Sequence, residues 1–187
     1  DNKSLYINRI SPACIACQKG IGGYTNSISY MCNRDCFFCF NTSLGDYDYY
    51  LKNKRDYIKR LDNISRGGQE VKHIALAGGE PLLHKEDVIR FFNYSREKYP
   101  GVYTRLYTSG DFIDTEILVA LKDVQLDEIR FSIKFDNTED ICRPVYDRIA
   151  LAKEYIPSVV VEMPVLPGTS EAMKCILVEL DKIDIFG

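Results

Sequence analysis

Short runs of β-branched and apolar residues alternate with longer amphipathic stretches along most of this chain. The short runs have the length of strands, and the longer stretches repeat apolar residues every three or four positions, as a helix with one buried face does. This alternation predicts βα units and a mostly parallel sheet. Five units are expected, with strands at 23–31, 71–77, 103–107, 128–135 and 159–165 and helices at 46–65, 85–99, 114–124, 138–155 and 170–183.

Helix-breaking residues set several of these boundaries. Gly67-Gly68 ends the first long helix and Pro100-Gly101 ends the second. Pro144 falls inside the helix expected at 138–155, where it predicts a kink or a later helix start. The chain begins with Asp1 in place of an initiator Met, so we expect it to be either processed or cut from a longer protein.

Composition supports one folded domain. The chain has 187 residues, of which 45% are hydrophobic and 27% charged, and this is enough apolar material for a core. A net charge of −3 does not indicate a nucleic-acid or anionic-membrane partner. No apolar run approaches the roughly 18 residues of a membrane span, and the first residues lack a signal peptide's apolar stretch, so we expect a cytoplasmic protein. We divide it into an N-terminal segment, 1–22, and one continuous core, 23–187.

Seven cysteines are present, and five of them fall within the first 39 residues. A disulfide framework suits a short secreted chain, whereas this chain shows no signal peptide and has enough apolar residues to fold without covalent links. Metal binding is therefore the favoured interpretation of the cluster.

Three of these cysteines, Cys32, Cys36 and Cys39, follow the first expected strand with the spacing C-x3-C-x2-C. Three thiolates on one loop can hold three corners of a [4Fe-4S] cluster, which takes four ligands in full. The fourth iron then has no protein ligand, and an open position is the mark of a catalytic metal site. Zinc is the structural alternative, and it needs a fourth ligand that this loop does not contain.

Two further motifs fall at the carboxyl ends of expected strands. Gly78-Gly79-Glu80-Pro81 follows the second strand and Thr108-Ser109-Gly110 follows the third. Glycines there let a ligand approach the backbone, so that carbonyl groups and Glu80 can accept hydrogen bonds from an ammonium group. Because ligands of parallel α/β folds bind at this end of the strands, we expect one active site that includes the cysteine loop.

The cysteine loop, with an aromatic Phe38 before its third cysteine, resembles the signature of the radical S-adenosylmethionine (radical SAM) superfamily. The resemblance implies an α/β fold, a partial (β/α)6 TIM-like barrel with about five units visible here. Residues 184–187 would then lie where the sixth strand begins, so the resemblance implies that the chain is part of a longer protein. It also implies that SAM chelates the open iron of the [4Fe-4S] cluster. An electron from the reduced cluster then cleaves SAM to give a 5′-deoxyadenosyl radical, which abstracts hydrogen from a substrate. In such a site Gly78, Gly79 and Glu80 would hold the methionyl amine.

Other cofactor contacts follow from this resemblance and from strand positions. Thr108 and Ser109 follow strand three, and Ser132 and Lys134 share a face of strand four, so these residues can offer hydroxyls and a cation to the ribose and carboxylate of SAM. The alternative for Lys134 is a structural carboxylate partner or solvent. Val165 lies in a stretch that resembles the adenine-packing segment of glycyl-radical-enzyme activases, so Phe38 and Val165 would border the adenine.

The activase resemblance favours a substrate that is a protein or peptide, with peptide modification and methyl transfer as alternatives. It also implies an electron donor such as a flavodoxin or ferredoxin.

Cys14 and Cys17 pose a separate question. This pair can be half of a zinc site or of an auxiliary cluster, or can remain reduced and idle, and the residues leave these alternatives open. A competing interpretation of the whole chain is a non-catalytic iron-sulfur or zinc protein with a structural or electron-transfer role.

Overall fold

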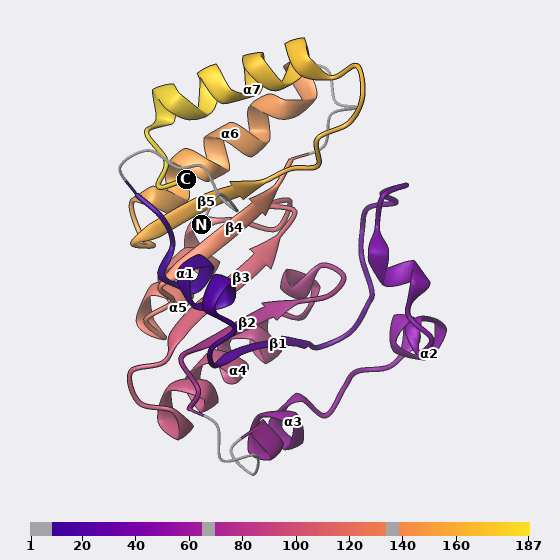
Figure 1. Ribbon diagram of the computed structural model, residues 1–187, viewed down its shortest axis with the longest axis vertical. Coiled ribbons are helices and arrows are strands. Elements are labelled where there is room, and N and C mark those ends of the chain that lie inside the picture. The colour runs from indigo at the N-terminus through magenta and orange to yellow at the C-terminus, as the bar shows by residue number, and fades with distance from the viewer. Residues whose placement is uncertain (1–8, 65–69, 134–138) are drawn as a thin grey trace.

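The computed structural model describes residues 9–64, 70–133 and 139–187. In this part of the chain five strands form one parallel sheet, in the spatial order β1-β2-β3-β4-β5 (Figure 1). The predicted α/β class and parallel sheet are therefore confirmed. The strands are β1 (Gly23–Ser27), β2 (His73–Ala77), β3 (Tyr103–Thr108), β4 (Glu128–Ser132) and β5 (Ser158–Glu162).

Helices fill the connections between the strands, as the sequence pattern predicts. Figure 1 shows α7 stacked on α6 beside β5, whereas α2 lies away from the sheet, beyond the arrowheads of the strands. The helices are α1 (Pro12–Lys19), α2 (Tyr47–Lys52), α3 (Tyr57–Ile64), α4 (Lys85–Lys98), α5 (Thr115–Asp123), α6 (Glu139–Lys153) and α7 (Ser170–Ile183), with short 3-10 turns η1 (Phe40–Ser43) and η3 (Pro81–His84).

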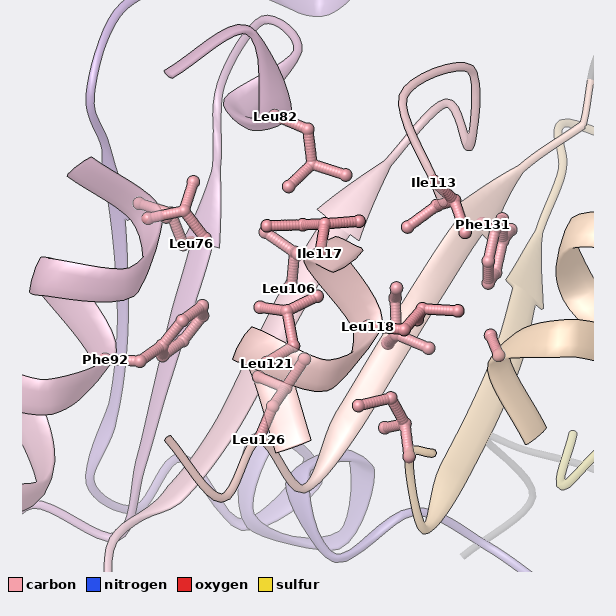
Figure 2. Close-up of a cluster of buried hydrophobic side chains, with 14 of the residues drawn as sticks. Leu76, Leu82, Phe92, Leu106, Ile113, Ile117, Leu118, Leu121, Leu126 and Phe131 are labelled. Carbon is pink, nitrogen blue, oxygen red and sulfur yellow. The ribbon is translucent and has the colours of Figure 1, made fainter. Parts of the chain in front are cut away.

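The hydrophobic core lies on one face of the sheet. Side chains alternate between the two faces of a strand, so every second residue points toward the covering helices. Leu76, Leu106 and Phe131 are fully buried on this face and pack with Leu118 and Leu121 of α5 (Figure 2). The opposite face carries polar side chains, which are described with the candidate site.

The single helix predicted at 46–65 is wrong, because α2 and α3 are separate. The chain leaves the helix at Asn53, whose backbone is extended (φ −126°, ψ 149°). The Arg55 N–H donates to Ile28 O at 2.7 Å, and the buried Arg55 guanidinium donates to Tyr30 Oη and to Asp46. These long-range contacts override the local helical periodicity, which cannot report them.

The first helix, α1, was not predicted, although its termini carry standard signals. The Ser11 hydroxyl caps the helix by accepting a hydrogen bond from the Ala13 N–H, and Pro12 occupies the first turn. Gly20 follows the last residue in the left-handed region (φ 65°), which favours glycine. Pro144 lies inside α6.

Residues at the end of the chain run beside β5. The Phe186 N–H donates to Val159 O and the Val161 N–H donates to Gly187 O, both at 2.9 Å. Residues 186 and 187 therefore lie along the edge of β5 that β4 does not occupy. Among the described residues, the structure contains no helix that has both the length and the apolar character needed to cross a membrane.

Candidate active site

Three loops meet at the carboxyl ends of the strands. The segment 28–39 follows β1, the segment 78–84 follows β2, and the segment 109–111 follows β3. Figure 1 shows the first of these loops extending beyond the arrowheads of the sheet. The sequence motifs therefore lie at one edge of the sheet, as predicted from their positions after strands.

Two glycines allow the loop after β2 to lie directly against the cysteine loop. A Cβ atom on Gly79 would lie 2.0 Å from Met31 O, and one on Gly78 would lie 2.7 Å from Ser29 O. Gly78 also has φ +118°, which other residues rarely adopt. The two segments pair through the Gly79 N–H to Ser29 O (3.2 Å) and the Glu80 N–H to Met31 O (2.8 Å). Because Cys32 follows Met31, this pairing positions the first cysteine.

The Glu80 carboxylate ties the loop after β2 to the end of β3. It is 2% exposed, and its oxygens accept hydrogen bonds from Thr108 Oγ1 (2.8 Å), the Ser109 N–H (2.6 Å) and the Leu82 N–H (3.0 Å). Three predicted site residues, Glu80, Thr108 and Ser109, are thus brought together. All three hydrogen bonds to this carboxylate come from the chain itself. A hydrogen bond from a methionyl amine to the Glu80 side chain therefore stays a prediction.

The three cysteines lie on the exposed side of this edge. Cys32 is exposed, and Cys36 and Cys39 are partly buried. A turn brings the last two close, with the Cys39 N–H donating to Cys36 O at 2.9 Å. Partial desolvation raises the pKa of the Cys32 thiol, and the charges of Glu80, Cys36 and Cys39 raise it further, whereas the hydrogen bond from the Arg34 N–H lowers it. A bound cationic group beside the loop would offset the repulsion between these negative charges and a Cys32 thiolate.

The donor set fits an iron-sulfur cluster. Within the described ranges, no three or more His, Cys, Asp or Glu side chains are grouped so that they could hold one metal ion. A cubane makes a different demand, because each thiolate binds a separate iron at its own corner. Cys32, Cys36 and Cys39 on one loop can supply three such thiolates, one for each of three irons.

An ion pair between the cysteine loop and the loop after β3 was not foreseen from the sequence. Arg34 donates to Asp111 through Nε (2.7 Å to Oδ2) and Nη2 (2.5 Å to Oδ1). Asn33 Nδ2 also donates to Asp111 at 2.7 Å, and Arg34 Nη2 reaches Ser109 O at 3.1 Å. The hydrogen bonds from Arg34 lower the pKa of Asp111 to about 2. Asn33 and Arg34 lie between the first two cysteines, so Asp111 anchors the middle of the loop.

The remaining residues predicted to contact the cofactor are not brought together by hydrogen bonds as Glu80, Thr108 and Ser109 are. Ser132 ends β4 with an exposed side chain, and its carbonyl lies 3.5 Å from Arg34 Nη1. Lys134 lies outside the described residues. Phe38 packs edge to face on Phe37, and the Val165 side chain is 80% exposed. The pairing of Phe38 and Val165 around an adenine therefore stays a prediction.

A charged network occupies the polar face of the sheet below this edge. Arg130 is 5% exposed and donates to the carboxylates of Glu128 and Glu162. Its Nη2 also donates to Cys14 Sγ of α1 at 3.3 Å. Helix α1 therefore packs on the face of the sheet opposite the hydrophobic core.

Comparison with known proteins gives a family match over most of the chain. The family model described as Radical SAM superfamily matches residues 26–177. A curated relative, "Putative glycyl-radical enzyme activating enzyme MJ0021" of Methanocaldococcus jannaschii, is 25% identical over 96% of this chain and 49% of its own length. The chain thus spans about half the length of this relative.

Solved structures share the fold. The structure titled native anSMEcpe with bound AdoMet and Cp18Cys peptide has a TM-score of 0.67 at 20% identity, over 87% of this chain and 48% of that one. Streptococcus suis SuiB bound to the precursor peptide SuiA has a TM-score of 0.69 at 13% identity, over 92% of this chain and 40% of that one. These structures support the predicted partial TIM-like barrel.

Proposed function

The chain belongs to the radical SAM superfamily, and from this premise we propose that it cleaves S-adenosylmethionine reductively at a [4Fe-4S] cluster held by Cys32, Cys36 and Cys39. The observation that carries the proposal is the backbone pairing of Met31 with Glu80, at 2.8 Å. This pairing sets the first cysteine beside the glycines at which an amino acid cofactor would bind.

When bound, the cluster supplies one electron and SAM supplies the carbon–sulfur bond that this electron breaks, which leads to hydrogen abstraction from a substrate. The chain's task is to hold and orient the two groups and to keep water from the reacting atoms. We assign the backbone of Gly78 and Gly79 to the methionyl amine. Because neither residue carries a side chain, this backbone lies directly against the cysteine loop.

The remaining site residues divide into contact and positioning roles. Ser132 presents an exposed side chain at the edge of the sheet, so we assign its hydroxyl, together with the Lys134 ammonium, to the ribose and carboxylate of SAM. Phe38 and Val165 are assigned to the adenine. Glu80 engages Thr108 Oγ1 and the Ser109 N–H, and through them it holds the β3 loop at the edge where SAM would bind.

The substrate that we propose is a protein or peptide. The name of the M. jannaschii relative refers to the activation of another enzyme, and the titles of two structures with the same fold name a bound peptide. A flavodoxin or ferredoxin would supply the electron. Free thiols and a reduced cluster require a reducing compartment, so we place the protein in the cytoplasm.

The test is SAM cleavage by the anaerobically reconstituted chain. We expect protein carrying four irons and reduced with dithionite to release 5′-deoxyadenosine and methionine from SAM. The Cys36→Ala variant should release neither product, whereas Cys175→Ala, which removes an exposed cysteine on α7, should match the unaltered chain. Absence of 5′-deoxyadenosine from fully loaded, reduced protein would overturn the proposal and favour a non-catalytic metal protein.

A further inference from the structure

Helix α1 holds two cysteines that the function proposed above does not use. Cys14 and Cys17 are three residues apart on this helix, so they lie on adjacent turns of one side. The geometry of an α-helix places their Cα atoms about 5 Å apart, within the range that a disulfide bridges.

The surroundings of Cys14 suit the thiolate that resolves a mixed disulfide. Cysteines near a helix N-terminus or beside a cationic group react readily. Cys14 is the third residue of α1 and is partly buried, and the buried guanidinium of Arg130 donates to its sulfur at 3.3 Å. Cys17 is exposed, with Lys19 in the same last turn of the helix. One sulfur can therefore meet a partner from solvent while the other is held beside a fixed cation.

A metal site is less well supported at this pair. A single zinc ion needs four ligands, and in the described parts of the chain no group of three or more His, Cys, Asp or Glu side chains could hold a metal ion. Disulfide formation is the chemistry that two neighbouring thiols can complete by themselves.

We propose that Cys14 and Cys17 form a reversible disulfide by exchange with a low-molecular-weight disulfide. The Cys17 thiolate attacks one sulfur of that disulfide, forming a mixed disulfide and releasing one thiolate. The Cys14 thiolate then attacks the sulfur of Cys17, which closes the Cys14–Cys17 bond and releases the second thiolate. Two electrons pass from the cysteine pair to the small disulfide, which is reduced to two thiols.

Helix geometry makes this bond easy to reduce. Side chains three positions apart on a helix have Cβ atoms about 5–6 Å apart, whereas a relaxed disulfide needs about 4 Å. Closing the bond therefore distorts the two-turn helix, and strained or exposed disulfides are the labile ones. The same helix holds the thiols close enough for rapid closure. The pair should thus respond to the thiol–disulfide balance of its surroundings.

Peptide mapping tests the proposal without any variant. Trypsin cuts after Arg9 and Lys19, so one peptide, 10–19, contains Cys14 and Cys17 and no other cysteine. The full chain, equilibrated with set ratios of oxidised to reduced glutathione, is alkylated and digested. We expect peptide 10–19 to shift, as the ratio rises, from carrying two alkyl groups to carrying none with a loss of two hydrogens, and dithiothreitol to reverse the change. Two alkyl groups at every ratio, or a bound metal that protects both cysteines, would overturn the proposal.

Single variants test the order of attack. Cys14→Ser should accumulate glutathione on Cys17, because the exposed Cys17 thiolate still attacks oxidised glutathione but no Cys14 thiolate is present to displace the bound glutathione. Cys17→Ser should accumulate several-fold less on Cys14, which is partly buried. Cys175→Ser is the matched control and should leave peptide 10–19 unchanged. Equal trapping at both cysteines would contradict the assigned roles, and circular dichroism of each variant confirms that its helices are intact.

Discussion

Arg34 of the cysteine loop and Asp111 of the loop after β3 form a two-point ion pair, with Nε at 2.7 Å from Oδ2 and Nη2 at 2.5 Å from Oδ1. The side chains are only 14% and 27% exposed, so solvent screens the pair weakly. Two parallel hydrogen bonds also fix direction, which a lysine in this place would not do. The pair therefore holds the middle of the cysteine loop on the end of β3.

Replacing Asp111 with Asn should loosen the cysteine loop. The change keeps the shape of the side chain but leaves Arg34 without its carboxylate partner. We expect the free energy of unfolding to fall by between about 1 kcal/mol, as for an exposed pair, and about 3 kcal/mol, as for a buried one. Urea unfolding of the cluster-free chain measures this. Glu171→Gln, which breaks the exposed pair with Lys174, is the comparison and should cost less.

Acid should weaken the same contact. The pKa of Asp111 is lowered from 3.8 to about 2, so its carboxylate stabilises the folded chain above the unfolded value. This contribution, about 2 kcal/mol at most, is lost as the pH falls from about 4 to about 2. The unfolding midpoints of the unaltered chain and of Asp111→Asn should therefore differ less at pH 2.5 than at pH 5. A constant difference between the two proteins would contradict the assignment.

Glu80→Gln separates a structural role from cofactor contact. The carboxylate accepts three hydrogen bonds, and an amide would turn one acceptor oxygen into a donor that faces other donors. We expect a loss of about 2–4 kcal/mol in stability even without cofactors. Glu86→Gln, at an exposed position in the first turn of α4, should change stability by less than about 0.5 kcal/mol. Unchanged stability in Glu80→Gln, combined with weaker SAM binding, would instead assign the side chain to the cofactor.

Gly79→Ala should displace the first cysteine. The added methyl group would lie 2.0 Å from Met31 O, a backbone atom one residue before Cys32, so the two segments must separate. We expect most of the cluster to be lost on anaerobic reconstitution, measured as iron and sulfide per chain. Gly45→Ala is the control, because a Cβ there meets no atom within 4 Å. Full cluster loading of Gly79→Ala would show that this close approach is dispensable.

Local patterns predicted the elements whose determinants are local. The helix expected at 170–183 matches α7 (Ser170–Ile183), and Pro100-Gly101 marks the stretch that follows α4. The strand predicted at 23–31 was too long and is observed as β1 (Gly23–Ser27), whereas the strand predicted at 103–107 is observed as β3 (Tyr103–Thr108). Beyond Ser27 the backbone pairs with the loop after β2 instead of continuing the sheet. The apolar residues in this stretch therefore do not mark a longer strand.

Contacts between segments far apart in the chain could not be predicted from the sequence. The break between α2 and α3 depends on Arg55 reaching Ile28 and Tyr30, and the anchor at Asp111 depends on Arg34, 77 residues earlier. No periodicity or motif reports such pairs. Helix α1 is different, because Ser11-Pro12 and Gly20 are recognisable start and stop signals that the prediction did not use.

The most direct test of the central claim is electron paramagnetic resonance of the reduced, reconstituted chain with and without SAM. If Cys32, Cys36 and Cys39 leave one iron of a cubane open, SAM must change the g values of the cluster signal. The signal itself should be absent from Cys36→Ala and intact in Cys175→Ala. A spectrum that SAM leaves unchanged, or zinc bound by the three cysteines and a fourth residue, would contradict the account.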